Sequence, residues 1–173
     1  MQAATEISKQ DLKELLNKGW LTHDAMWFYC CFQELGIEKT NELNRGAVGL
    51  MAMIETKRML KTLSMRDEVF DSFEKVWRFF EGARQIVIPD WMDFTFESPR
   101  PGVIRWEWRA CFAHDGLKRI GAIDGYQCGV MYRIESWLNT LGVRYEMKPK
   151  VEGCLMRETG ACKGEIHFFF DGS

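Results

Sequence analysis

The residues best suited to chemistry in this 173-residue chain are its six cysteines and three histidines. Four of the cysteines lie in the last third of the sequence, at Cys111, Cys128, Cys154 and Cys162. A cysteine can be a small buried hydrophobe, a metal ligand or, as a thiolate, a nucleophile. We therefore expect any chemistry to lie between residues 108 and 170.

A metal site is the first alternative for these thiols. Tetrahedral sites usually take ligands from close pairs such as C-x-x-C, because two residues of one turn can reach the same ion. No such pair occurs, and the adjacent Cys30 and Cys31 point in different directions on a helix. A zinc or iron site would need the fold to bring together Cys111, Cys128, Cys154 and Cys162. The spacing of the cysteines disfavours such a metal site, and the sequence does not identify a cofactor.

A reactive thiol is the second alternative. Cys128 stands at the start of a predicted helix, where the dipole and the free amide groups lower a thiol pKa. Lys118 and Arg119, in a predicted loop, could add positive potential. The structural alternative is that Cys128 packs beneath the helix. Cys154 is the other candidate nucleophile, in a strand of the last predicted hairpin.

Histidine is the first candidate for proton transfer at neutral pH. His114 follows Cys111 closely and neighbours Asp115, which makes it the candidate general base. His23 begins a helix, and His167 lies in the last strand. A hydrogen-bonded structural role is the competing interpretation for all three.

The first half of the chain has helical periodicity. Apolar spacing and capping residues predict helices over about 8–17, 22–36, 40–63 and 64–82, with Gly19, Gly36 and Gly82 as stops. We expect the apolar stripes of these helices to form a core. Their length leaves a homodimer as an alternative.

The second half alternates apolar and polar residues. Residues 92–97 and 103–112 predict a hairpin around the turn SPRPG, and residues 126–141 predict a helix ended by Gly142. Residues 143–158 and 164–170 predict two further strands, with Pro149 at a bulge, edge or break. The expected fold is α+β, with N-terminal helices packed on an antiparallel sheet built as ββ-α-ββ.

Length and composition favour one domain over residues 1–173, with a helical part to about 85 and a sheet-containing part from about 86. Lys and Arg number 23 against 25 Asp and Glu, so no net field attracts nucleic acid or anionic lipid. The sequence shows neither the basic start and apolar run of a secretory signal nor an apolar stretch of about 18 residues. We expect a cytoplasmic protein with no membrane or nucleic-acid partner.

The C-terminal pattern resembles the 4-vinyl-reductase-like ligand-binding domains. It consists of C-x4-G-x4-G from Cys111, E-x-C ending at Cys154, and T-G-x-C ending at Cys162. The pattern is also similar to the L-2-amino-thiazoline-4-carboxylic acid hydrolase-like proteins. The segments WLTHDAMWF and ELG-x-E-x-x-NELN resemble an uncharacterised cytosolic prokaryotic family related to those hydrolases. One departure is the insertion of residues 163–165 before the last aromatic strand, which leaves the direction of Cys162 open.

This resemblance implies the α/β fold of the vinyl reductases and TRAPP-type trafficking subunits, with a small-molecule pocket between helices and sheet. The expected function is small-molecule binding in a cysteine-lined pocket. The residues expected to line it are Trp27, Trp106, Trp108, Cys111 and Tyr132. The alternative is a hydrolase that opens a cyclic C–N bond, with Cys128 or Cys154 as nucleophile or metal ligand and His114 as base.

Overall fold

A long, kinked helix dominates the first third of the chain. The computed structural model describes residues 6–89 and 91–170, and helix α1 spans Lys9–Thr62. Ser8 caps it, since its Oγ accepts a hydrogen bond from the Asp11 amide at 3.0 Å. At Gly36 the backbone takes φ 74° and ψ 175°, a conformation that only glycine adopts readily. Gly36 thus separates an arm, residues 9–35, from the second half of α1.

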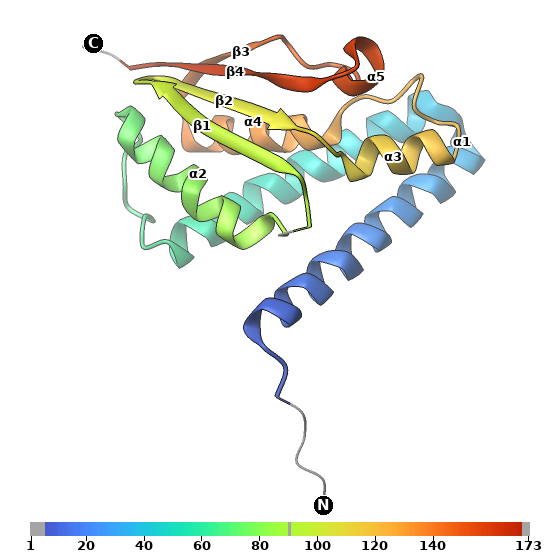
Figure 1. Cartoon of the computed structure of the whole chain (residues 1–173), viewed down its shortest axis with the longest axis horizontal. Helices are drawn as coiled ribbons and strands as arrows, with labels where there is room; N and C mark the ends of the chain where they lie inside the picture. The colour runs from blue at the N-terminus through green and yellow to red at the C-terminus, as the bar shows by residue number, and fades with distance from the viewer. Residues whose placement is uncertain (1–5, 90, 171–173) are drawn as a thin grey trace, which may run out of the picture.

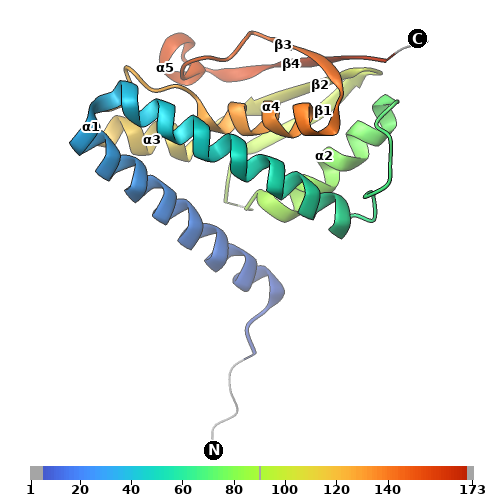
Figure 2. The same ribbon diagram turned by 180° about the vertical axis from the view of Figure 1, so that it is seen from behind.

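The arm extends away from the rest of the molecule (Figure 1, Figure 2). The helices predicted over 8–17 and 22–36 are one continuous helix, so the prediction that Gly19 ends a helix is wrong. Gly19 does not adopt a positive φ, and the helix continues through it. The predicted interruption at Gly36 is confirmed.

The next helix begins later than predicted. Helix α2 spans Phe73–Val87 with Ser72 as N-cap, so the expected bounds 64–82 are wrong at both ends. Gly82 does not stop it. A Cβ at Gly82 would lie 2.5 Å from a methyl group of Leu63, so this glycine permits close packing between α1 and α2.

A four-stranded antiparallel sheet follows, with strand order β1-β2-β4-β3. Its strands are β1 (Phe94–Arg100), β2 (Val103–Trp108), β3 (Arg144–Lys148) and β4 (Cys162–Phe169). The predicted hairpin is β1–β2, in which Phe96 pairs with Trp106. Strand β4 lies between β2 and β3, with Ile166 opposite both Ile104 and Met147.

Three further helices lie between the strands: α3 (Phe112–Arg119), α4 (Gly129–Leu141) and α5 (Leu155–Thr159). Helix α4 begins at Gly129, three residues later than predicted, with Cys128 as its N-cap, and it ends as predicted at Gly142, which has φ 72°. The strand predicted over 143–158 is wrong beyond Lys148, because β3 ends before Pro149 and α5 follows. Helix α3 occupies the predicted loop that contains Lys118 and Arg119.

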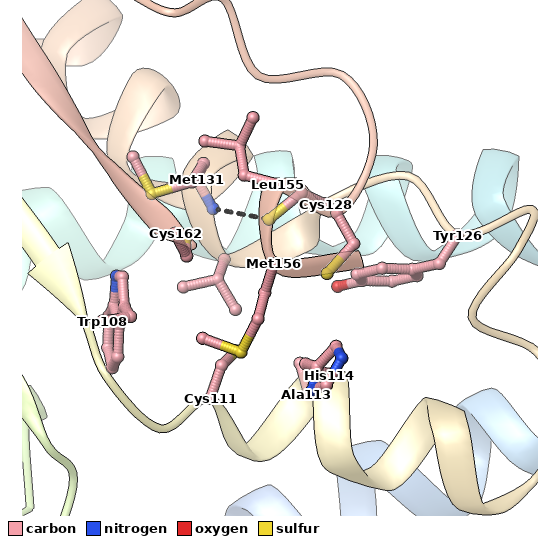
Figure 3. Close-up of a pocket in the computed structure, with 12 residues that line it drawn as sticks. Trp108, Cys111, Ala113, His114, Tyr126, Cys128, Met131, Leu155, Met156 and Cys162 are labelled. Carbon is pink, nitrogen blue, oxygen red and sulfur yellow. Dashed lines mark hydrogen bonds between the residues drawn. The ribbon is translucent and has the colours of Figure 1, made fainter. Parts of the chain in front are cut away.

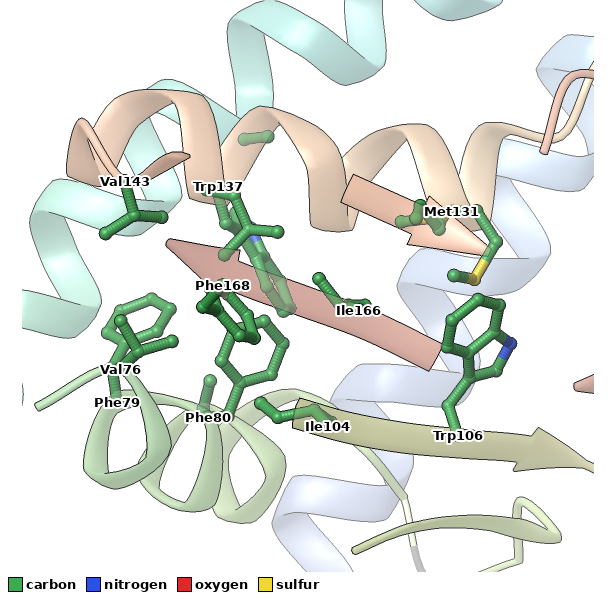
Figure 4. Close-up of a cluster of buried hydrophobic side chains, with 14 of the residues drawn as sticks. Val76, Phe79, Phe80, Ile104, Trp106, Met131, Trp137, Val143, Ile166 and Phe168 are labelled. Atoms are coloured by element: carbon green, nitrogen blue, oxygen red, sulfur yellow. The ribbon is translucent and has the colours of Figure 1, made fainter. Parts of the chain in front are cut away.

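The core lies between one face of the sheet and helices α2 and α4 (Figure 4). Ile104, Trp106, Ile166 and Phe168 project from the sheet toward Phe79 and Trp137. The second half of α1 packs on α4 from outside (Figure 2). The opposite sheet face is charged, with Arg105 bonded to Glu165 at 2.8 Å and to Glu97 at 3.1 Å. The molecule is therefore α+β, with helices layered on one side of an antiparallel sheet.

Candidate functional site

The four C-terminal cysteines converge on one small pocket, the thiol pocket (Figure 3). Cys111, Cys128 and Cys154 each stand at the N-cap of a helix, before α3, α4 and α5 respectively. Cys162 is the first residue of β4. The pocket has a volume of about 10 Å³, enough for one water molecule. The structure therefore answers the open question about Cys162, which does line the pocket.

Local hydrogen bonds hold these elements around the pocket. The Cys128 amide donates to the Glu152 carbonyl at 3.0 Å, which joins the start of α4 to the segment before α5. The Cys128 sulfur accepts from the Met131 amide at 3.5 Å. The Tyr126 hydroxyl accepts from the Gly129 amide at 2.8 Å. These hydrogen bonds fix the position of the turn that carries Cys128.

Burial favours the protonated form of three of the pocket thiols, those of Cys111, Cys128 and Cys162. It raises the pKa of Cys128 to about 12, and the hydrogen bond from the Met131 amide lowers the pKa by less. Burial also raises the pKa of Cys162 to about 12 and raises the pKa of Cys111. The expectation that the helix N-terminus lowers the pKa of Cys128 is wrong, because the loss of water around the thiol outweighs the amide groups.

Of the three histidines, His114 is the one that reaches the thiol pocket. Its Nδ1 lies 2.9 Å from a carboxylate oxygen of Asp115. His23 lies on the arm with its ring 6.4 Å from that of Trp27. The Nε2 of His167 lies 3.0 Å from Glu165 on the charged face of the sheet. His114 is therefore the histidine that could exchange a proton with a pocket ligand.

The pocket thiols are close together, but they are not arranged as metal ligands. Within the described part of the chain, no group of three or more His, Cys, Asp and Glu side chains could hold a metal ion as they stand. Thioethers of Met131 and Met156 complete the sulfur-rich lining. Its walls can make soft, polarisable contacts with a ligand.

A much larger cavity, the cleft, opens between the arm and the rest of the molecule, with a volume of about 840 Å³. The arm lines it with Leu21, Ala25 and Phe28, and the second half of α1 with Ala47 and Met51. The cleft shares five lining residues with the thiol pocket: Trp108, Cys111, Ala113, Tyr126 and Val130. The thiol pocket therefore adjoins the inner end of the cleft, and these side chains lie between the two cavities.

A charged cluster stands in the mainly apolar wall of the cleft. The Arg133 guanidinium lies over the rings of Trp20 and Trp137, at 4.9 and 5.2 Å from their centroids. Arg133 also makes a two-point ion pair with Glu55, and its Nε–Oε2 distance is 2.8 Å. Desolvation raises the pKa of Asp24 nearby, although Arg133 and His23 oppose that shift. These groups offer charged contacts to a ligand in the cleft.

The structure brings Trp108 and Cys111 to the site but places the other expected ligand-binding residues elsewhere. Trp27 is 62% exposed on the arm, and Trp106 is 2% exposed in the core. The Tyr132 ring packs on Gly49 of α1, with its hydroxyl 3.3 Å from the position of a Cβ there. Trp27, Trp106 and Tyr132 line neither cavity. The sequence interpretation missed Arg133 and the arm residues.

One family model matches the chain, over residues 5–84, and it describes a family of unknown function, DUF6125. The match includes the arm and part of the cleft wall but ends before the four pocket cysteines. No curated protein and no solved structure matches the chain. Among residues 6–89 and 91–170, none of the helices combines the length and apolar character that a membrane span requires.

Proposed function

We propose that this chain is a cytoplasmic small-molecule-binding domain with a 4-vinyl-reductase-like arrangement. Its ligand occupies the cleft and lies against the wall that the cleft shares with the thiol pocket. The observation that carries the proposal is the cleft itself, whose wall is mainly apolar and holds several polar groups. Ligand sites in proteins commonly have this character and a volume of about 300–1,000 Å³.

One polar group indicates the ligand chemistry at the inner end. Trp108 is 8% exposed, and its indole N–H has no hydrogen-bond partner in the described part of the chain. A buried donor without an acceptor is costly, and a ligand oxygen or nitrogen that reaches it after a movement of the surrounding side chains would relieve that cost. We infer an apolar or aromatic ligand that carries a hydrogen-bond acceptor.

The hydrolase alternative receives less support from this geometry. A cysteine nucleophile attacks as the thiolate, and burial disfavours the thiolate of Cys128. The His114 ring is hydrogen-bonded to Asp115, and this contact explains the position of the ring without an ion pair to a cysteine. Binding accounts for the cavity without a thiolate.

Two matched alanine variants test this function. Ala113 lines both cavities, and Ala161 is similarly half-buried but lines neither. With anilinonaphthalene sulfonate as a fluorescent probe, we expect Ala113→Trp to weaken binding at least about tenfold, because the indole fills the inner end of the cleft. Ala161→Trp should leave the affinity unchanged. Circular dichroism checks that both variants are folded.

A folded Ala113→Trp protein that binds the probe as tightly as wild type would refute binding at the inner end of the cleft. Organic extraction and mass spectrometry of purified protein supply a second readout. A co-purifying apolar compound present in wild type and in Ala161→Trp, but depleted from Ala113→Trp, is the expected result.

A further inference from the structure

The arm has two apolar sides, and one of them lines the cleft of its own molecule. Leu21, Ala25 and Phe28 face the cleft. Leu12, Leu16 and Trp27 line neither the cleft nor the thiol pocket and are 46%, 63% and 62% exposed. At 3.6 residues per turn these three fall on one side of the helix, opposite Leu21 and Phe28. We call this the outer side of the arm.

A helix that is apolar on both sides is normally buried on both. With Leu15, which is 64% exposed, the three outer residues leave on the order of 400 Å² of apolar side chain uncovered. A stable interface takes roughly 800 Å² from each partner, including a polar rim. These four residues supply about half of that area, and the flanking side chains of the arm form the rim around them.

The charges of the arm are distributed unevenly along it. Residues 9–18 hold Lys9, Lys13 and Lys18 against Asp11 and Glu14, a net charge of +1. Residues 19–35 hold Asp24 and Glu34 and no Lys or Arg, a net charge of −2 with histidine neutral. Two arms side by side in opposite directions would therefore set unlike charges together, whereas parallel arms would set like charges together.

The shape of the molecule leaves the outer side open to a partner. The rest of the chain lies beyond the C-terminal end of the arm and along its inner side, across the cleft (Figure 1). The outer side therefore faces away from the body, which does not block a second arm there. Gly19 lies near the middle of the outer side, and a Cβ there would meet nothing within 4 Å. Its small size permits another backbone to approach at the crossing point.

We propose that the partner of the outer side is a second copy of this chain. The two arms pair antiparallel through Leu12, Leu16 and Trp27 and cross near Gly19. This arrangement has twofold symmetry, so each copy contributes the same surface. Because the inner side of the arm is a wall of the cleft, the pairing also supports the cavity from outside.

The oligomeric state measured by analytical ultracentrifugation tests the proposal. We expect wild type to be a dimer and Leu16→Glu or Trp27→Glu to raise its dissociation constant more than about tenfold, because a carboxylate enters the apolar contact. The matched control is Leu50→Glu, since Leu50 is also 63% exposed but lies in the second half of α1. It should remain a dimer.

Disulfide crosslinking tests the direction of pairing in a Cys30→Ser, Cys31→Ser background. Antiparallel arms that cross near residue 19 bring two Gly19→Cys thiols together but keep two Leu12→Cys thiols roughly 20 Å apart, from a rise of 1.5 Å per residue. With a mild oxidant, Gly19→Cys should therefore form a linked dimer and Leu12→Cys should not. A monomeric wild type, an intact Leu16→Glu dimer, equal disruption by Leu50→Glu, or crosslinking of Leu12→Cys would each overturn the proposal.

Discussion

At the scale of single residues, the thiol pocket shows which properties of a cysteine depend on its neighbours. The helix start at Cys128 could be predicted from sequence, because it depends on a few adjacent residues. The protonation of Cys128 could not, since its pKa of about 12 is set mainly by burial, to which distant parts of the chain contribute. The convergence of Cys111 and Cys162 with Cys128 likewise depends on the sheet.

Thiol alkylation measures this difference between buried and exposed cysteines. Cys30 is exposed on the arm, whereas Cys154 is buried and burial raises the pKa of Cys128. With iodoacetamide at neutral pH, we expect peptide mass spectrometry to find Cys30 modified first. Cys128 and Cys154 should react at least about tenfold more slowly until the protein is unfolded in urea. Labelling of native Cys128 as fast as Cys30 would restore the reactive-thiol hypothesis.

At the scale of elements, local signals predicted the hairpin β1–β2, helix α4 and an interruption of the helix at Gly36. The local signals failed where contacts between distant parts of the chain determine whether a helix ends. Gly19 and Gly82 look like helix stops in sequence, yet α1 and α2 continue through them, and Leu63 occupies the space beside Gly82. The cleft was missed for a related reason, because the angle between the arm and the rest of α1 positions two of its walls.

Two glycine-to-alanine substitutions in α1 compare the kink at Gly36 with an ordinary helical position at Gly46. At Gly36 the backbone with φ 74° and ψ 175° would cost an alanine about 1–3 kcal/mol, so Gly36→Ala should lower the free energy of unfolding by that amount. At Gly46 the backbone is helical and a Cβ meets nothing within 4 Å. Gly46→Ala should therefore raise the free energy of unfolding by about 0.5–1 kcal/mol.

Urea unfolding followed by circular dichroism gives both free energies. The sign of the change is the informative result, since the substitution is the same and both positions lie in one helix. If Gly36→Ala were neutral or stabilising, the helix would not need its kink, and the arm would not be held at its present angle to the cleft.

At the scale of the whole molecule, stability is concentrated away from the arm. The main core comprises side chains of the sheet, α2, α4 and the second half of α1, and no residue of the arm belongs to its buried set. The arm reaches only a smaller cluster, where Phe28 and Phe32 pack near Leu117 and Tyr126. Residues 9–20 therefore depend on something other than the core to remain helical, because isolated helices of this length are marginal in water.

Hydrogen exchange distinguishes support by a second copy from support by the arm's own molecule. If paired arms protect each other, Leu16→Glu should speed amide exchange in residues 9–30 and leave residues 40–62 unchanged, since the core still holds the second half of α1. Leu50→Glu should leave the arm protected. Mass spectrometry of peptic fragments resolves these segments. Equal protection of residues 9–30 in wild type and Leu16→Glu would mean that the arm is stable alone, and its exposed outer leucines would then need another explanation.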